Sequence, residues 1–459
     1  MKQYDGFEDL LTSQAGRIPD RAALLYEKNG STASVTWREF LAMSRRRARE
    51  LSDTGKSCIG ILCDGSLDCV VTMFGSVLAG LQTVLLGEAA SEELLQEQIR
   101  AADVDLLWGD DELAEEFSSC LQGAREPQNP GSILFFTSGT TSRSKAVVLS
   151  DRSLMASAWN GSCMLPLSEE DLLMCMLPLD HVFGCVCSLL WGLSCGSCVA
   201  LGRGARHYMD DLLFFRPTVL SAVPALLAFL LDRDVLNPQL RLVLIGAGSC
   251  PRSYLDAAAS RGIRVSFGYG MTETSSGIAI SVSGDPYALE ICPDDTVTIA
   301  PDGEILVRSP GCMMTGYYRQ PEETARVLKG GVLSTGDLGS IDENGRLHIT
   351  GRKKEILVLK DGTKIFLPEY EGQLCRTLGT GELAVLAPEG VPVLLIQADP
   401  SSRSRIQNAL RDLMSGYPRG QQLADIVFTD APLPRTATGK LMRKELDALY
   451  VRQTAEHHK

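Results

Sequence analysis

Short apolar runs alternate with helix-length amphipathic stretches over most of this chain, and this rhythm restricts the possible folds more than any other feature. CIGILCD (58–64) is followed by DCVVTMFGSVLAGL (68–81) and then by QTVLLG (82–87). The same alternation returns between PTVLSAV and IRVSFGYG, over residues 217–270. Strands that alternate with helices form mainly parallel sheets with helices on their faces, so the sequence predicts an α/β fold.

The pattern changes after Asp294, where shorter strand-like pieces are separated by Asp-Gly and Asn-Gly pairs, which are typical of hairpin turns. We therefore expect a small β-rich subdomain at the end of a large N-terminal domain, residues 1–350, that consists otherwise of α/β subdomains. The chain is basic at Gly351–Lys354 and then resumes a strand–helix alternation. This predicts a hinge near Lys354 and a small α+β C-terminal domain, residues 351–459, which is a normal size for an independent domain.

Charge and cysteine content exclude some classes of protein. Lys and Arg number 44 against 57 Asp and Glu, a net charge of −13. A surface this acidic repels a phosphate backbone, so we expect no nucleic-acid partner. The N-terminus lacks a basic segment followed by an apolar one, and fourteen cysteines are spread from Cys58 to Cys375. These features predict reduced thiols and a cytoplasmic protein.

The uncharged stretch VFGCVCSLLWGLSCGSCVAL (182–201) is long enough to cross a membrane. Three glycines, three serines and four cysteines interrupt it, which favours a buried helix, a glycine turn and a buried strand over a transmembrane segment. The cysteines lie close in sequence to His181, but an apolar tract lacks the polar groups that support zinc ligands. We expect these thiols to behave as small buried side chains.

The strongest chemical signal is SILFFTSGTTSRSKAVV (132–148), an apolar strand followed by a loop of hydroxyl residues that ends in Lys145. Hydroxyl groups and free backbone N–H groups bind phosphate oxygens, and the lysine adds a positive charge. The spacing differs from the Walker P-loop. Taken alone, this segment is equally compatible with a polar surface loop.

Further motifs follow along the chain: LPLDHVFG (177–184), GAGS (246–249), YGMTE (269–273), STGD (334–337), GRKK (351–354) and PRTATGK (434–440). With these motifs, the chain resembles the adenylate-forming superfamily of acyl-CoA synthetases, aryl-CoA ligases, luciferases and peptide-synthetase adenylation domains. The resemblance covers essentially the whole length and is nearest to the fatty acyl-CoA synthetases. It implies an ATP-dependent enzyme with a mobile C-terminal domain.

The resemblance assigns residues to the nucleotide. The phosphate-binding loop would contain Thr137, Ser138, Gly139, Thr140, Thr141 and Lys145. The adenine and the acyl channel would be bordered by Ala247, Gly248, Ser249, Tyr269 and Gly270. Thr272 would contact the α-phosphate, and Glu273 would hold Mg²⁺ through hard oxygen ligands. Asp337 would accept both ribose hydroxyl groups, with Arg352 on the ribose side.

The remaining assignments concern the acid and the movement of the C-terminal domain. By resemblance, His181 lies at the mouth of the acyl pocket and Lys354 is the hinge pivot. Lys440 would bridge the carboxylate and the α-phosphate, where negative charge develops. The implied reaction joins a medium- or long-chain fatty acid to AMP and then to a thiol, that of CoA.

Four alternatives stay open at this point. The acceptor could be the phosphopantetheine of an acyl carrier protein, or the acid could be aromatic. Asp180 beside His181 could pair with an ammonium group, which would suit an amino acid. The loop carries Ser142, Ser144 and Ala146 where the family has Gly, Pro and Gly, which raises the possibility of a catalytically weak nucleotide-binding homologue.

Overall fold

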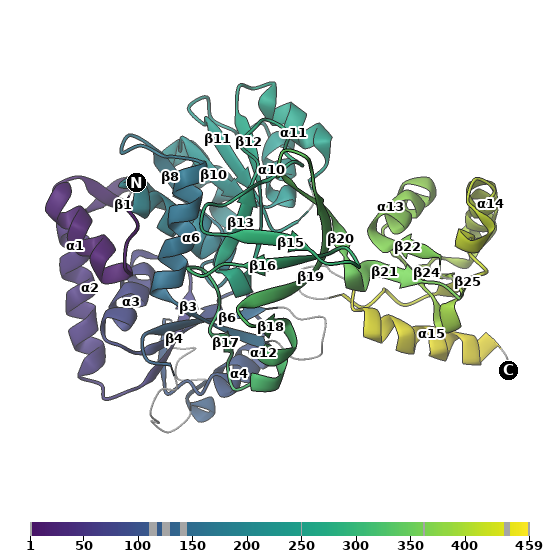
Figure 1. The fold of residues 1–459 in the computed structure, drawn as a ribbon, viewed down its shortest axis with the longest axis horizontal. Helices are drawn as coiled ribbons and strands as arrows, with labels where there is room; N and C mark the ends of the chain where they lie inside the picture. Colours follow the sequence, from purple (N-terminus) through teal and green to yellow (C-terminus); the bar gives the residue numbers. More distant parts are fainter. Residues whose placement is uncertain are drawn as a thin grey trace. The chain divides into compact units, whose positions relative to one another are not determined.

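The chain folds into two compact units, which are described separately (Figure 1). The computed structural model describes residues 2–109, 117–121, 129–137, 145–248, 250–360, 363–435 and 441–457. The larger unit consists of Met1–Thr335 and Ser340–His348, and the smaller one of Gly336–Gly339 and Ile349–Lys459.

A nine-stranded sheet forms one half of the larger unit, in the order β14-β13-β12-β11-β10-β8-β9-β1-β2. The six strands from β12 to β1 run parallel, and β2, β13 and β14 are antiparallel additions at the edges. Helices connect the central strands, as the alternation in the sequence predicts. The strands are β1 (Ala22–Lys28), β2 (Ser31–Thr36), β8 (Leu172–Cys175), β9 (Cys198–Leu201), β10 (Val219–Ala222), β11 (Leu242–Ile245), β12 (Arg264–Met271), β13 (Ser276–Ile280) and β14 (Glu290–Ile291).

A second sheet of six strands has the order β17-β7-β6-β4-β3-β5. Strands β3 to β6 pair in parallel, whereas β7 forms an antiparallel hairpin with β6 and then pairs with β17. All six residues of β3 are buried, which explains why this strand is a continuous apolar run in the sequence. The strands are β3 (Cys58–Cys63), β4 (Gln82–Gly87), β5 (Leu106–Trp108), β6 (Ser132–Thr137), β7 (Lys145–Ser150) and β17 (Gly316–Tyr317).

Serine or threonine residues cap several helices of the larger unit. Figure 1 shows α1, α2 and α3 side by side, and Phe74 of α3 stacks on Phe7 of α1 with 4.3 Å between ring centroids. Thr36 and Glu39 form a reciprocal capping box at the start of α2. The helices are α1 (Phe7–Arg17), α2 (Trp37–Ser52), α3 (Leu67–Leu78), α4 (Glu92–Ala101), α6 (Asp151–Met164), α9 (Tyr208–Phe215), α10 (Pro224–Asp232), α11 (Arg252–Ala259) and α12 (Pro321–Val327).

The uncharged tract 182–201 is a buried helical segment, a turn and a strand, as expected from its glycines. Short helix α7 (Val182–Gly184) leads into a π-helical stretch η2 (Cys185–Leu190) and then into α8 (Trp191–Cys195). Gly196 ends the helix with a φ of 76°, a conformation that favours glycine. Strand β9 follows. Within the described residues, no helix combines the length and the apolar character that crossing a membrane requires.

The predicted β-rich subdomain is a five-stranded sheet in the order β15-β16-β19-β18, with β20 paired to β19. Gly303 and Gly345 have positive φ values of 89° and 77° at the two hairpin turns, where the sequence has Asp-Gly and Asn-Gly. The chain passes between the two units within the last two strands. The strands are β15 (Thr296–Ile299), β16 (Glu304–Arg308), β18 (Leu328–Lys329), β19 (Val332–Ile341) and β20 (Leu347–Arg352).

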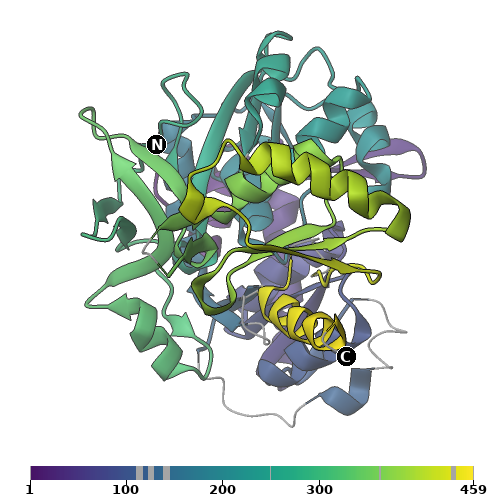
Figure 2. The ribbon, with the colours of Figure 1, turned by 90° about the vertical axis from the view of Figure 1, so that its right-hand side faces the viewer.

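The smaller unit has a three-stranded sheet with helices on both faces. In Figure 2, α14 and α15 lie on opposite sides of this sheet. Alternate strand residues account for the arrangement, since Val385 and Leu394 pack with α13 and α14, whereas Leu386 and Leu395 pack with α15. The elements are β21 (Ile356–Val358), β22 (Lys364–Phe366), α13 (Leu367–Leu378), β23 (Leu383–Leu386), β24 (Val393–Gln397), α14 (Arg403–Met414), β25 (Asp425–Thr429) and α15 (Arg443–His457).

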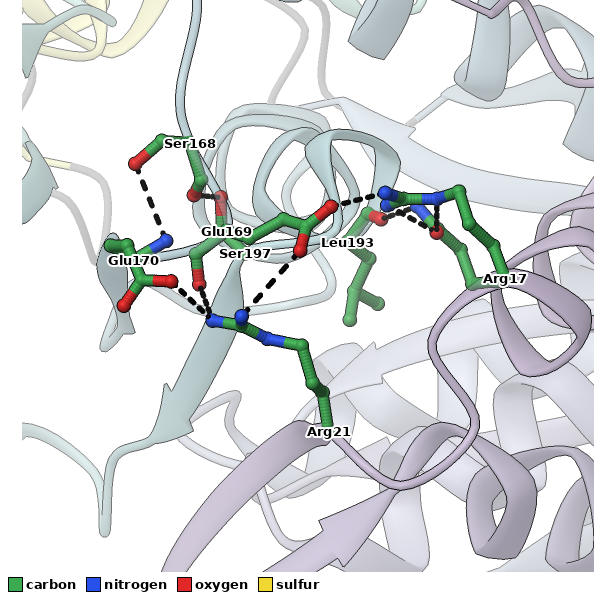
Figure 3. A network of polar contacts seen from close by, with 8 residues as sticks. Arg17, Arg21, Ser168, Glu169, Glu170, Leu193 and Ser197 are labelled. Atoms are coloured by element: carbon green, nitrogen blue, oxygen red, sulfur yellow. Dashed lines mark hydrogen bonds and ion pairs between the residues drawn. The ribbon is translucent and has the colours of Figure 1, made fainter.

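A polar network ties the end of α1 to the turn before β8 (Figure 3). Arg17 pairs with Glu169, and Arg21 pairs with Glu169 and Glu170. Arg21 also donates to the Glu169 carbonyl at 2.7 Å, and the Ser197 hydroxyl donates to the carbonyl of Ser168 at 2.7 Å. The charged groups are partly exposed, so we attribute to them the placing of the N-terminal segment rather than a large share of the stability.

Candidate active site

The β6–β7 hairpin places two predicted site residues opposite each other. Thr137 ends β6 and pairs with Lys145, the first residue of β7. The Thr137 hydroxyl donates to the carbonyl oxygen of Lys145 at 3.4 Å. Ser138, Gly139, Thr140 and Thr141 lie in the connecting segment, outside the described residues, as do Ser142 and Ser144. The hairpin fixes both ends of the predicted phosphate-binding loop.

Lys145 contacts an acid and an aromatic ring. Its Nζ lies 2.7 Å from Oε2 of Glu323 at the start of α12 and 4.7 Å from the centroid of the Tyr317 ring. A hydrogen bond from Lys145 is the main cause that lowers the pKa of Glu323. Glu323 is therefore a carboxylate at neutral pH, and Lys145 is held over the ring by an ion pair and a cation–π contact.

Glu273 lies in a tight turn that both neighbouring strands support. The turn, η4 (Thr272–Thr274), follows β12, and Ser275 closes it with a φ of 53°. The Glu273 carbonyl accepts a hydrogen bond from the Met314 N–H at 2.8 Å. Its side chain is 9% exposed, and its Oε1 accepts a hydrogen bond from the Tyr317 hydroxyl at 2.7 Å. The carboxylate is thus buried, and one of its oxygens is held in place.

Tyr317 connects Lys145 to Glu273. Strand β17 pairs with β7, which places Tyr317 opposite Val147 and beside Lys145. Burial, together with the negative charge of Glu273, raises the pKa of Tyr317 far above its usual value. The tyrosine is accordingly a neutral donor at every physiological pH, and its hydroxyl supplies the buried Glu273 side chain with a hydrogen bond.

Tyr269, Gly270 and Thr272 precede Glu273 along the same segment. Tyr269 is half-buried in β12, opposite Ala279 of β13. A Cβ atom on Gly270 would lie 1.5 Å from the carbonyl oxygen of Ser276, so no other residue fits this close crossing. The motif therefore has a structural reason as well as its predicted role at the nucleotide.

The loop after β11 contains Ala247 and Gly248, whereas Ser249 lies outside the described residues. Ala247 has a φ of 62°, a left-handed conformation that is uncommon for alanine. A Cβ atom on the preceding Gly246 would lie 2.7 Å from the Phe183 ring. A backbone held in this way, at the carboxyl end of a parallel strand, suits a ligand site.

His181 and Asp180 precede α7. His181 is exposed, and its carbonyl oxygen accepts the Cys185 N–H at 2.9 Å, so its imidazole is free of the core. Asp180 faces the end of β4, because a Cβ atom on Gly87 would lie 2.6 Å from its Oδ2. Burial raises the pKa of Asp180. Asp180 does not line the cavity described below, which weakens the reading of the chain as an amino-acid ligase.

The smaller unit brings together two other predicted residues. Asp337 is 3% exposed, and its Oδ1 lies 2.8 Å from Nε of Arg352. Lys354 lies two residues further on, in the turn Lys353–Glu355. Asp337 is therefore a buried carboxylate with an arginine beside it, as the ribose assignment requires. Lys440 lies outside the described residues, so its predicted role stays a prediction.

A small cavity lies in the core of the larger unit, between α6, the helical tract 182–195, β11 and β13. It encloses about 20 Å³, roughly the space that one water molecule needs. The described residues that line it carry no charge: Ser157, Ala158, Gly161, Leu165, Val186, Cys187, Trp191, Leu244, Gly277 and Ile280.

Four of these side chains were not singled out by sequence reasoning: Tyr317, Glu323, Ser157 and Trp191. Tyr317 belongs to a two-residue strand, which is too short to show a periodic pattern. Ser157 is one of several small residues of α6, and nothing in its spacing marks it. Only the pairing of strands and helices that are distant in sequence reveals these contacts.

The cysteines form no disulfide, since all fourteen are free thiols. Burial raises the pKa of Cys187 to about 11, so it is a neutral thiol at physiological pH. Across the described ranges, no three His, Cys, Asp or Glu side chains gather in a way that could hold a metal ion. A divalent ion at Glu273 would need further ligands from a bound substrate. The phosphate oxygens of a nucleoside triphosphate supply such ligands to Mg²⁺.

Comparison with known proteins identifies the family of this chain. The family model described as "AMP-binding enzyme" matches residues 11–318. A 2-succinylbenzoate–CoA ligase of Bacillus velezensis is 28% identical over 487 residues, which cover 96% of this chain and 97% of that protein. The corresponding ligase of Bacillus subtilis is also 28% identical, with 95% and 96% covered.

Solved structures of CoA ligases have the same fold as this chain. The o-succinylbenzoate CoA synthetase from Bacillus subtilis, in complex with ATP and magnesium ion, superposes with a TM-score of 0.80 at 25% identity, covering 95% of this chain and 99% of that one. An anthranilate CoA ligase in complex with anthranoyl-AMP has a TM-score of 0.78 at 20% identity, with 98% of each chain covered, and shows the fold alone.

Proposed function

The chain belongs to the AMP-binding enzyme family and is an AMP-forming acid–thiol ligase, and on that premise we propose that it joins a compact aromatic acid to CoA. The observation that carries the proposal is the contact of Tyr317 with both Lys145 and Glu273. It places a cation over the ring and a buried carboxylate at the hydroxyl of the same tyrosine, and a metal–triphosphate complex needs both charges nearby.

The reaction has two steps. In the first, a carboxylate oxygen attacks the α-phosphorus of ATP, which gives an acyl-adenylate and pyrophosphate. In the second, the thiol of CoA attacks the acyl carbon, loses its proton, and releases AMP as the leaving group. Neither step requires a protein nucleophile, so catalysis rests on positioning and on charge stabilisation.

The residues present fit the nucleotide and its metal ion. Lys145 suits the negative charge of the triphosphate, and Asp337 has the acceptor oxygens that ribose hydroxyl groups need. Glu273 is the residue that would hold Mg²⁺, which would neutralise charge on the phosphates. The Tyr317 hydroxyl would keep that carboxylate oriented whether or not the ion is bound.

The proposed acid differs from the fatty acid expected from sequence motifs. The relatives named above carry 2-succinylbenzoate, an aromatic acid, in their names. The cavity offers about 20 Å³ and ends at Trp191, whose Nε1 donates to the Leu165 carbonyl at 3.2 Å and so fixes the ring. A long hydrocarbon chain does not fit a space of this size without displacing the buried indole, which favours a compact acid.

CoA is proposed as the acceptor because the names of these relatives contain it. A carrier protein presents the same phosphopantetheine thiol and is the alternative. The two acceptors differ only in what surrounds the thiol, so a direct comparison of both is part of the test.

The test measures ATP–pyrophosphate exchange and CoA-thioester formation with benzoate derivatives, 2-succinylbenzoate and fatty acids of several lengths. We expect an aromatic acid to give the highest kcat/KM, with AMP and thioester formed in equal amounts. A fatty acid as the best substrate, or thioester formation with a carrier protein alone, would overturn the proposal.

A variant of Lys440 tests the division into two steps. Lys440→Ala should abolish adenylate formation and leave thioester formation from supplied acyl-adenylate largely intact, because the lysine is proposed to act only where the acid meets the phosphate. Equal loss of both steps would contradict the proposed role of Lys440 and leave the choice of acid untouched.

A further inference from the structure

We propose that Ser157 recognises an uncharged hydrogen-bonding substituent of the acid, such as a hydroxyl group, at the end distant from the reacting carboxylate. This inference rests on the proposed function and specifies its substrate. It starts from the Ser157 side chain, which lines the cavity, is 3% exposed, and has a hydroxyl group without a hydrogen-bond partner in the described part of the chain.

The cavity connects by its walls to the segments that carry the reaction. Val186, Cys187 and Trp191 belong to the helical tract that begins directly after His181. On the opposite wall, Gly277 of β13 lies four residues after Glu273 in the sequence. It pairs with Gly270 of β12. The cavity therefore shares its walls with the helical tract that begins after His181 and with the strand that follows the turn carrying Glu273.

The Ser157 hydroxyl suits this role because a buried hydroxyl group without a hydrogen-bond partner destabilises the folded protein. A substrate group that completed its hydrogen bond would recover this energy. Ser44, Ser188 and Ser266 are also buried without a partner in the described residues, but none of them lines the cavity. Ser157 differs from them because it lines a cavity that can hold one small group.

The substituent should be uncharged. The described residues of the cavity wall include no Lys, Arg or His, and the nearest titratable group among them, the Cys187 thiol, has its pKa raised to about 11 by burial. A second carboxylate would enter without a counter-charge, which is strongly unfavourable in an apolar environment. On this argument, the acid differs from the 2-succinylbenzoate of the named relatives, which has two carboxylates.

The size of the cavity also favours a small uncharged substituent over a carboxylate. The cavity holds one water-sized group, and the fixed Trp191 ring closes it beyond that point. A hydroxyl or amino substituent fits this space, whereas a carboxylate has three heavy atoms. The ring that bears the substituent would lie between the cavity and His181.

The experiment compares matched acids on the purified full-length enzyme. Its substrates are benzoate, the three hydroxybenzoates, the three benzenedicarboxylates and 2-succinylbenzoate, each with ATP, Mg²⁺ and CoA. We expect one hydroxybenzoate to exceed benzoate in kcat/KM and every dicarboxylate to be poorer. In Ser157→Ala, we expect kcat/KM for that hydroxybenzoate to fall about tenfold through KM, with benzoate unchanged.

The matched control is Ser188→Ala, which removes an equally buried, partnerless hydroxyl outside the cavity. It should alter neither substrate, and thermal unfolding of both variants verifies that they are folded. The inference is overturned if 2-succinylbenzoate or another dicarboxylate is preferred, or if Ser157→Ala affects benzoate and the hydroxybenzoate equally. Absence of thioester formation with every aromatic acid is a different result, because it removes the proposed function and this inference together.

Discussion

The two ends of the proposed active site in the larger unit differ in chemistry. The nucleotide end is charged, with Lys145, Glu273 and Glu323 arranged around Tyr317. The acid end is an uncharged cavity in which Ser157 is the residue with an unused hydrogen-bonding group. Every acid needs the same triphosphate chemistry, whereas the acid itself varies. The comparison indicates that the charged end determines the reaction and the uncharged end determines the substrate.

The largest effect should come from Glu273→Gln. The variant keeps the shape of the side chain and removes the charge that Mg²⁺ would neutralise. We expect adenylation to fall about 10²- to 10³-fold, by the same factor for every acid. Pyrophosphate exchange with two acids of different size measures this. A change in the preference between the acids would break the division between the two ends.

The second prediction concerns Trp191→Phe at the acid end. The smaller ring loses the hydrogen bond to the Leu165 carbonyl and opens the end of the cavity. We expect kcat/KM for naphthoate to rise about tenfold relative to benzoate, with KM for ATP unchanged. An altered KM for ATP at unchanged acid preference would show that the two ends are not separate.

A smaller effect is expected from Glu323→Gln. ATP must replace Glu323 as the partner of Lys145, so removal of this charge weakens the competition. We expect KM for ATP to fall about two- to fivefold, with KM for the acid unchanged. The matched control is Glu322→Gln, one residue earlier in the same helix, which should leave both values unchanged. A rise in KM for ATP would mean that Glu323 orients Lys145 instead of competing for it.

The smallest expected effect is on the free energy of unfolding, and it comes from Asp295. Burial raises the pKa of Asp295 to about 7, and its Oδ2 accepts a hydrogen bond from Asn160 of α6 at 3.2 Å. The folded chain therefore keeps a proton on Asp295 that the unfolded chain releases near its ordinary value of 3.8. Stability from this group is complete below about pH 4 and is lost as the pH rises to 7.

Asp295→Asn removes this titration. We expect it to raise the Tm by a few degrees at pH 8 relative to wild type, and by less at pH 5. Thermal unfolding at the two pH values measures the difference. Equal shifts at both pH values would show that Asp295 is not protonated in the folded chain.

The sequence allowed much of the fold to be predicted, because local patterns determine it. The buried parallel strands are continuous apolar runs, and the glycines of 182–201 and of the hairpins lie where the chain turns. The order of the strands was not predictable. Strand β1 lies beside β9, and β17 beside β7, because side chains distant in sequence pack together.

The residues of the proposed site also divide into those that the sequence predicted and those that it did not. Thr137, Lys145 and Glu273 belong to short motifs, and their placement at a hairpin and a tight turn follows from neighbouring residues. Tyr317 contacts Glu273, 44 positions away, and Lys145, which is still more distant in sequence, and Ser157 lines a cavity formed by several elements. No local pattern encodes these contacts. The motifs therefore indicated the chemistry correctly, whereas the proposed acid changed once the cavity was known.

The π-helical stretch η2 has a consequence for how this enzyme can diverge. A π-helical turn contains one residue more than an α-helical turn, so the deletion of a single residue between Cys185 and Leu190 could restore an ordinary helix. Because the wider turn accommodates the extra residue, its deletion would leave the side chains on either side in their orientation and would remove one side chain from the turn. One codon lost at this point would therefore change the cavity wall at Val186 and Cys187 while the hairpin and the turn around Glu273 kept their sequence, which is a short evolutionary route from one substrate to another.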